Sequence, residues 1–233
     1  AGSTSTTAQV NAEEFIETFS PILEAGEDVL YIAFSSGLSG TCQSAMIAKR
    51  QLAERFPGRR VEVFDSLAAS MGEGLLVYLA AQQKKAGASL DAALQWLGEN
   101  VLHLCHWFTV DDLNHLKRGG RVSAATALVG TMLGIKPVLH VDDEGHLVPV
   151  SKVRGRRQSL DELVRKMEET AIDPAGQTVF ISHGDCLEDA QYVEKRIREK
   201  LGVRDFHMNF IGPVIGAHSG PGTVALFFLG KHR

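Results

Sequence analysis

Two clusters rich in glycine and serine carry the residue types best suited to binding an anion. SSGLSGT (35–41) follows an apolar run and precedes a helical pattern, and GPVIGAHSGPG (212–222) contains His218 and Ser219. Backbone N–H groups at a helix N-terminus attract anions, glycines let a ligand approach the backbone, and hydroxyls add donors. We therefore expect the two clusters to form one site for a phosphate or a carboxylate. A capped helix start with a tight turn is the alternative for the first cluster.

Neither cluster matches a catalytic or nucleotide-binding motif. The first lacks the lysine of a P-loop, and its serine spacing is not that of G-x-S-x-G. The alternative function is a serine hydrolase or acyltransferase that uses Ser36 and His218, and it would need a carboxylate to orient the histidine. Asp65 and Asp185 are the candidates, but no spacing places either beside His218. We therefore expect a binding protein with no catalytic residues.

The composition is that of an ordinary globular protein and argues against a nucleic-acid partner. Of the 233 residues, 44% are hydrophobic and 22% are charged, and the formal net charge is −4. Nucleic-acid binders usually carry a basic excess. The basic run KVRGRRQ (152–158) suggests a DNA-binding regulator, but it is more typical of a solvated face or a protein-docking patch.

The cysteines and apolar runs indicate the cellular compartment. The chain has three widely spaced cysteines and no CxxC, which favours a reducing cytoplasm over a disulfide framework. No apolar run reaches the ~20 residues that span a bilayer, and the first ten residues do not resemble a signal peptide. In HLCH (103–106), a strand would put His103 and Cys105 on one face and His106 on the other, so we expect no metal site.

The first hundred residues alternate between helical and strand patterns. Asn11 can cap a helix over 11–26, and the apolar runs at 28–34 and 61–66 are typical of buried strands. Further helical patterns cover 41–56, 71–87 and 89–101. This alternation predicts a parallel α/β sheet.

The pattern changes near residue 100. A strand is expected at 103–110, two short helices around a basic Gly-Gly turn at 111–134, and a hairpin at 136–153 with its turn at 142–145. The remaining expected elements are a helix at 159–171, a strand at 177–183, a helix at 187–201, and strands at 205–212 and 222–230. The hairpin makes this half α+β. We therefore predict two domains, 1–100 and 101–233, with the ligand site between them.

Five motifs in order resemble those of the DegV family of lipid-binding proteins and cover nearly the whole chain. They are TAQVNAEEF (7–15), SSGLSGTCQSA (35–45), LKRGGRVS (116–123), LGIKPVLHVDDEGHLVPVSKVRGRRQSL (133–160) and IGPVIGAHSGPG (211–222). The family usually opens with a strand that ends in an Asp-Ser pair and a helix or two before the first of these motifs, a segment that this sequence does not include. The family also often has Ser in place of Ala8.

The resemblance implies a two-domain fold, with a Rossmann-like parallel α/β N-terminal domain and an α+β C-terminal domain containing a mixed sheet. It implies a long-chain fatty acid buried between the domains, and no other cofactor or metal. The protein would be the non-catalytic, acyl-carrying subunit of a bacterial fatty acid kinase in phospholipid metabolism. A separate ATP-dependent kinase subunit would convert the bound carboxylate to an acyl phosphate, in the cytoplasm and with transient membrane contact.

The resemblance also implies the site residues. The family's carboxylate-holding threonine, serine and histidine match Thr7, Ser36 and His218. Ser35 is an adjacent candidate, because the sequence does not settle which serine points inward. The other expected ligand-binding residues are Gly37, Gly40, Thr41 and Ser219. Family arginines that face the kinase or the pocket mouth match Arg118, Arg121 and Arg154, which we expect on one exposed face.

The chemistry of an acyl carrier agrees with these residue types. Each buried CH₂ contributes ~0.8 kcal/mol, so a long tail supplies most of the affinity. An ionised carboxylate at an apolar tunnel needs several donors, which hydroxyls, glycine-loop amides and one imidazole provide.

Overall fold

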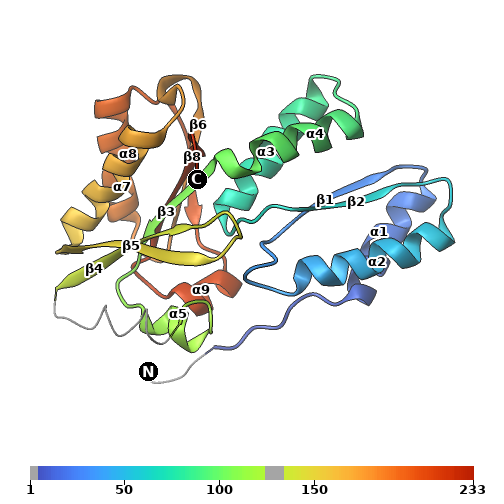
Figure 1. The fold of residues 1–233 in the computed structure, drawn as a ribbon, viewed down its shortest axis with the longest axis horizontal. Coiled ribbons are helices and arrows are strands. Elements are labelled where there is room, and N and C mark those ends of the chain that lie inside the picture. Colours follow the sequence, from blue (N-terminus) through green and yellow to red (C-terminus); the bar gives the residue numbers. More distant parts are fainter. Residues whose placement is uncertain (1–4, 124–133) are drawn as a thin grey trace.

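The computed structural model describes residues 5–123 and 134–233, which contain a two-stranded sheet and a six-stranded sheet (Figure 1). Helix α3 (Met71–Lys85) contacts β1 of the small sheet and three strands of the large one. The two sheets are therefore joined by a shared helix as well as by the chain between them.

The small sheet pairs β1 (Val29–Ala33) with β2 (Val61–Asp65) in parallel, as the alternating pattern predicts. Helices α1 (Ala12–Glu24) and α2 (Thr41–Arg55) lie against it. Asn11 and Glu14 form a reciprocal capping box that fixes the start of α1. Phe15 and Phe19 then pack on Tyr31 of β1, with ring centroids 4.9 and 5.9 Å from the tyrosine ring.

Helices α3 and α4 (Leu90–Asn100) build the core that reaches the large sheet. Leu75 and Leu76 of α3 are buried in one apolar cluster with Ile32 of the small sheet and Phe108 of the large one. Because this core spans both sides of residue 100, the domain boundary that we placed there stays a prediction.

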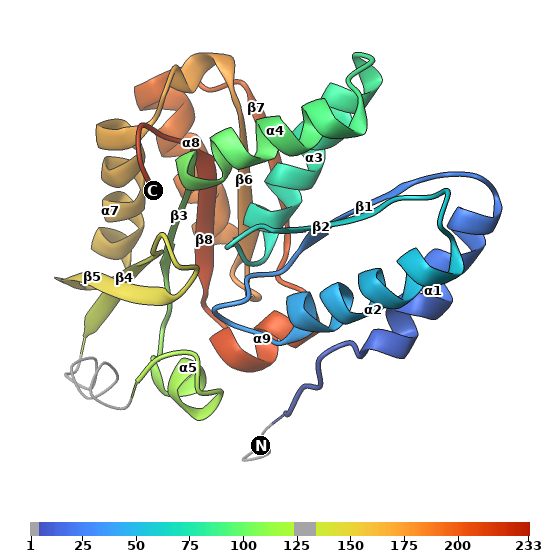
Figure 2. The same ribbon diagram turned by 45° about the vertical axis from the view of Figure 1, so that its right-hand side comes forward.

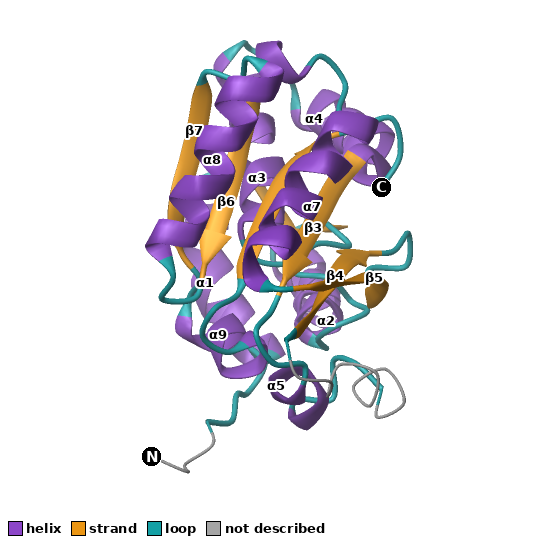
Figure 3. Cartoon of the chain, turned by 90° about the vertical axis from the view of Figure 1, so that its left-hand side faces the viewer, coloured by secondary structure: helices purple, strands orange, loops and turns teal. Residues whose placement is uncertain are grey.

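The large sheet has the strand order β5-β4-β3-β8-β6-β7 and is mixed, as expected. Its strands are β3 (Leu104–Thr109), β4 (Ile135–Val141), β5 (Leu147–Arg154), β6 (Thr178–His183), β7 (Asp205–Phe210) and β8 (Val224–Leu229). Among the described strands of this sheet, only the neighbours β6 and β7 run parallel, and the expected hairpin forms between β4 and β5. Figure 3 shows α7 (Arg156–Thr170) and α8 (Leu187–Leu201) covering one face, with α3 behind the other.

Two expectations from the sequence need comment. Of the two helices expected at 111–134, α5 (Asn114–Arg118) forms, and the second falls largely on residues 124–133, which lie outside the described ranges. The cluster at 212–222, expected as a loop, contains the helix α9 (Pro213–Ser219). Pro213 occupies the first turn, where its missing N–H costs no hydrogen bond, and Gly212 is extended before it. Single 3₁₀ turns lie at Val101–His103 and Pro174–Gly176.

The side chain of Arg233 ties several of these parts together. It is only 8% exposed, and it donates hydrogen bonds to the carbonyls of Val101, Leu104, Leu67 and Asp142. These carbonyls belong to the 3₁₀ turn before β3, the start of β3, the loop after β2 and the β4–β5 turn. A buried guanidinium is tolerated where such acceptors replace water. None of the helices in the described ranges is long and apolar enough to cross a membrane.

Candidate functional site

A cavity of about 480 Å³ lies between the β1–α2 loop and the large sheet. Its walls are mostly apolar and include Phe34, Phe108, Val141, Leu147, Ile215 and Phe227. Figure 2 shows α9 next to the start of α2, with the segment before α1 passing beneath them. Residues 8–10 of that segment line the cavity and are exposed, so the cavity opens to solvent there. Its size is that of a site for a small molecule.

Polar side chains gather at this open end. Thr7 Oγ1 and His218 Nε2 are 2.8 Å apart, although 211 positions separate the two residues. Ser39 Oγ and Thr41 Oγ1 are 2.9 Å apart at the start of α2. We call the polar residues that line this end of the cavity the mouth cluster: Thr7, Ser39, Thr41, Arg121, His218 and Ser219. The two glycine-serine clusters of the sequence therefore meet at one cavity.

The surroundings of His218 favour its neutral form. Burial and the neighbouring Arg121 guanidinium lower the pKa of His218 below its usual value. If Nε2 of His218 donates in the hydrogen bond that it shares with Thr7, the Thr7 hydroxyl remains free to donate to a ligand. Nδ1 of His218 and Oγ of Ser219 are buried without a hydrogen-bond partner among the described residues, and Nδ1 packs against Gly119. The donors that line the otherwise apolar cavity are therefore the hydroxyls of Thr7, Ser39 and Thr41 and the guanidinium of Arg121.

The structure places both candidate serines outside the cavity lining. Ser36 is exposed, and its backbone N–H donates to Asp65. Ser35 is fully buried, and its hydroxyl donates to the carbonyl of Gly145 and so holds the β4–β5 turn. Neither serine lines the cavity, whereas Ser39, which the sequence analysis did not select, does.

The local backbone explains this change. The N–H groups of both Leu38 and Ser39 bond the carbonyl of Ser35, so the loop turns and directs Ser36 away from the cavity. Because α2 begins at Thr41, Ser39 is the serine nearest the helix N-terminus. That position is visible in the sequence and could have identified Ser39.

The two glycines expected to bind the ligand instead permit close packing. A Cβ on Gly37 would lie 2.8 Å from the carbonyl oxygen of Glu144 in the β4–β5 turn. A Cβ on Gly40 would overlap the side-chain amide of Gln9. These glycines therefore bring the hairpin turn and the N-terminal segment against the loop.

The three arginines do not share one exposed face. Arg121 is partly buried and lines the cavity, where its Nε donates to the carbonyl of Leu38. The Gly119-Gly120 turn, with Gly120 at φ +73°, reverses the chain and turns Arg121 inward. Arg118 and Arg154 are exposed, at the end of α5 and the end of β5.

Among the described residues, no carboxylate is hydrogen-bonded to His218 as a hydrolytic triad would require. The partner of His218 is Thr7, and Asp65 accepts hydrogen bonds from the N–H groups of Ser36 and Leu67. Within the described ranges, no group of three or more His, Cys, Asp or Glu side chains is placed to hold a metal ion. In HLCH, His103 bonds the carbonyl of Gly230, and burial raises the pKa of Cys105 to about 12.

Known proteins match this chain along nearly its whole length. The model of a family described as "Uncharacterised protein, DegV family" matches residues 1–231. A DegV domain-containing protein of Clostridium perfringens is 48% identical over 97% of this chain and 78% of its own length.

Solved structures share the fold. A DegV family protein from Thermus thermophilus, described as binding fatty acid, is 33% identical with a TM-score of 0.85, over 97% of this chain and 79% of its own. The Streptococcus pneumoniae Fatty Acid Kinase (Fak) B3 protein, loaded with linoleic acid, is 20% identical to this chain with a TM-score of 0.88. The match covers 98% of this chain and 79% of that protein. At this identity it shows the common fold alone. The family match, the identity to the relatives and the two-sheet fold agree with the five motifs: the chain belongs to the DegV family.

Proposed function

We propose that this protein carries a long-chain fatty acid and has no catalytic activity of its own. The carboxylate lies at the mouth cluster, and the hydrocarbon chain fills the apolar cavity. The observation that carries the proposal is the pairing of Thr7 with His218 beside the guanidinium of Arg121 and the hydroxyls of Ser39 and Thr41, at the open end of an apolar cavity of about 480 Å³.

The energetics support this assignment. A buried carboxylate is stable only where charged or polar donors replace its water. Arg121 supplies a positive charge, and Thr7, Ser39, Thr41 and His218 supply hydroxyl and imidazole groups. Behind them the lining is apolar, and burial of the chain provides ~0.8 kcal/mol per CH₂. The DegV family protein from Thermus thermophilus, which is described as binding fatty acid, adds independent support.

Native mass spectrometry of freshly purified protein tests the proposal. We expect a long-chain fatty acid to co-purify, and the delipidated protein to bind a fatty acid more tightly than the fatty alcohol of equal length. The alcohol fills the same apolar cavity but lacks the charge that the mouth cluster recognises. Equal binding of acid and alcohol, or no binding of either, would refute it.

We further propose that the carrier presents the carboxylate to a separate kinase, which docks through Arg118 and Arg154. Both side chains are exposed cations on a protein whose net charge is −4. Complementary charge speeds and orients the encounter of two proteins.

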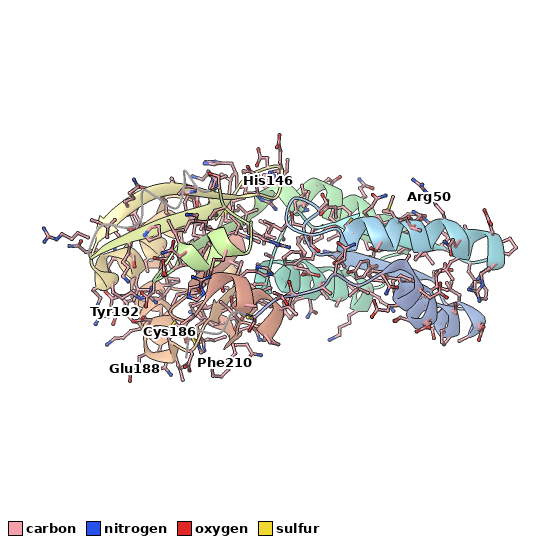
Figure 4. All side chains as sticks on the ribbon, turned by 90° about the horizontal axis from the view of Figure 1, so that it is seen from below. Arg50, His146, Cys186, Glu188, Tyr192 and Phe210 are labelled. Carbon is pink, nitrogen blue, oxygen red and sulfur yellow. The ribbon has the colours of Figure 1, made fainter. Side chains whose placement is uncertain are left out.

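Charge reversal tests the docking step. Arg118→Glu and Arg154→Glu should leave fatty acid binding unchanged and slow kinase-dependent phosphorylation of the bound acid. Arg50→Glu is the matched control, because Figure 4 shows Arg50 on α2, well away from β5. Normal phosphorylation in both variants would remove the docking role and leave the carrier proposal intact.

A further inference from the structure

The walls of the cavity differ in how firmly they are held. At the deep end, away from the mouth cluster, the wall consists of β3 and β8, where His106 and Phe227 pair in an antiparallel ladder. The β4–β5 turn is tied to its neighbours by hydrogen bonds from Ser35 and Arg233. The wall formed by residues 7–10, which we call the strap, has weaker ties than either.

Side chains alone hold the strap in place. No backbone group of residues 5–10 forms a hydrogen bond with another described residue. Thr7 shares a hydrogen bond with His218, and Nε2 of Gln9 donates to Oγ of Ser44 at 3.3 Å. The residues on either side of Gln9 are exposed, so little apolar surface anchors the strap. A segment with so few buried contacts opens at a low cost in free energy.

Gln9 fits closely against the start of α2. A Cβ on Gly40, the residue before α2, would overlap the side-chain amide of Gln9. Ser44, one turn into α2, is 7% exposed, and Gln9 is the only hydrogen-bond partner of its hydroxyl among the described residues. A buried hydroxyl without a partner is unfavourable, so this contact favours the position of the strap seen here.

The strap lies between the cavity and the solvent. Figure 2 shows it running past α9 and the start of α2 toward α1. Thr7 belongs to the mouth cluster, and residues 8–10 both line the cavity and are exposed. A ligand with its carboxylate at the mouth cluster therefore has the strap on its solvent side.

We propose that Gln9 is the positioning residue that holds the strap closed against α2, and that the strap lifts to let the ligand enter and leave the cavity. This inference rests on the proposed function, because it assumes that the ligand is a fatty acid. Gln9 contacts α2 and is not part of the mouth cluster, so its contacts are the same in the empty and the loaded protein. It therefore controls how fast the ligand exchanges and not how tightly it binds.

Rapid-mixing fluorescence with cis-parinaric acid, a naturally fluorescent long-chain fatty acid, tests the strap in the delipidated protein. Gln9→Ala should raise the association and the dissociation rate constants alike, by about five-fold. Loss of one hydrogen bond shifts an open–closed equilibrium by a factor of this order. The dissociation constant, which is the ratio of the two, should stay nearly unchanged. A merely structural role in the cavity wall would weaken binding instead.

A second variant assigns the effect to the contact with α2. Gly40→Ala should raise both rate constants in the wild type, because the new methyl group displaces the amide of Gln9. Gly40 has φ −74°, which alanine adopts without strain. In the Gln9→Ala background the same change should add nothing, since no amide remains to be displaced. If Gly40→Ala does not fold, Ser44→Ala, which removes the acceptor, supplies the same cycle.

Gln51→Ala is the matched control, because Gln51 is an exposed residue of α2 that does not line the cavity. Both of its rate constants should equal those of the wild type.

The rate constants separate the possible outcomes. Wild-type values in Gln9→Ala would mean that the ligand passes through another wall and would overturn the proposal. A faster dissociation with a matching loss of affinity would overturn it too, by making Gln9 a ligand contact. Additive effects of Gln9→Ala and Gly40→Ala would show that Gly40 acts without Gln9, with the same consequence. Failure of the wild type to bind cis-parinaric acid would instead overturn the proposed function, so the two proposals can fail separately.

Discussion

The two ends of the cavity each present a histidine with an unpartnered ring nitrogen that lies against a glycine. His218 lies against Gly119 at the mouth, and His106 lies against Gly72 at the deep end. Their surroundings differ. His218 is partly exposed and has Thr7 as a partner, whereas His106 is 2% exposed and packs on an aromatic ring. The two histidines therefore differ in their surroundings: helix termini and loops meet around His218, whereas strands and an aromatic ring enclose His106.

The largest effect is expected at the mouth, from His218→Ala. Loss of one hydrogen bond to a charged group costs ~1.5–3 kcal/mol, so fatty acid affinity should fall ~10-fold or more. Calorimetric titration of the delipidated protein measures it. Ser36→Ala is the control, since Ser36 is exposed and does not line the cavity, and its affinity should equal that of the wild type. A loss in Ser36→Ala and none in His218→Ala would reverse our assignment.

At the deep end, Gly72→Ala should destabilise the fold by ~1–3 kcal/mol, because the new methyl group overlaps the imidazole of His106. Helix propensity alone predicts the opposite, a gain of up to ~1 kcal/mol. Gly98 of α4 offers the matched comparison, since a Cβ there meets nothing within 4 Å and Gly98→Ala should stabilise. Denaturant unfolding gives both values, and equal gains would show that the space beside His106 is not tight.

Acidification should lower the free energy of unfolding of the ligand-free protein more through His106 than through His218. Burial, then Arg233 and His140, lower the pKa of His106 in the folded state, while in the unfolded chain it stays near 6.5. Below about pH 6.5 the unfolded state therefore binds a proton that the folded state does not, and stability falls on acidification. One such group contributes at most ~1.4 kcal/mol per pH unit.

Unfolding free energies between neutral pH and about pH 5 measure this contribution. His106→Phe should show a shallower loss than the wild type. His218→Ala should change the slope less, because His218 is partly exposed. Identical slopes for the wild type and His106→Phe would mean that His106 gains its proton in the folded state.

The smallest effect is expected for Ser39→Ala, which should weaken fatty acid binding about five-fold, or ~1 kcal/mol. Thr41, whose hydroxyl lies 2.9 Å from that of Ser39, remains to contact the carboxylate. Titration of the single variants and of the Ser39→Ala/Thr41→Ala double variant should reveal a loss larger than the sum. Strict additivity would indicate that the two hydroxyls act independently.

The mouth was largely predictable from the sequence, and the deep end was not. Glycines and hydroxyl residues before a helix are a local signal, and they led to Thr41, His218 and Ser219, which do line one cavity. Ser36 lies outside the cavity because the turn of the loop decides which serine faces inward, and the sequence does not show that turn. The family resemblance, and not spacing, connected Thr7 with His218.

Contacts between residues distant in sequence explain why the deep end of the cavity could not be predicted. Alternation along HLCHWFTV correctly separates the two faces of β3, with Cys105 and Trp107 in one core and Phe108 in the other. It cannot reveal that His106 meets a cavity, because the other walls come from the β1–α2 loop, from residues 69–70 before α3 and from β8. The position of α3 against both sheets likewise depends on contacts between residues distant in sequence.

The place of β8 in the large sheet has a consequence for synthesis of the protein. The strand is the last in the described chain, yet it lies between β3 and β6 and joins the two halves of the sheet. Until it leaves the ribosome, β3 and β6 each present an unpaired edge, the kind of surface that aggregates. A nascent chain that lacks β8 therefore carries two unpaired strand edges, and the cavity cannot assemble before His218 emerges, which happens only shortly before β8 does.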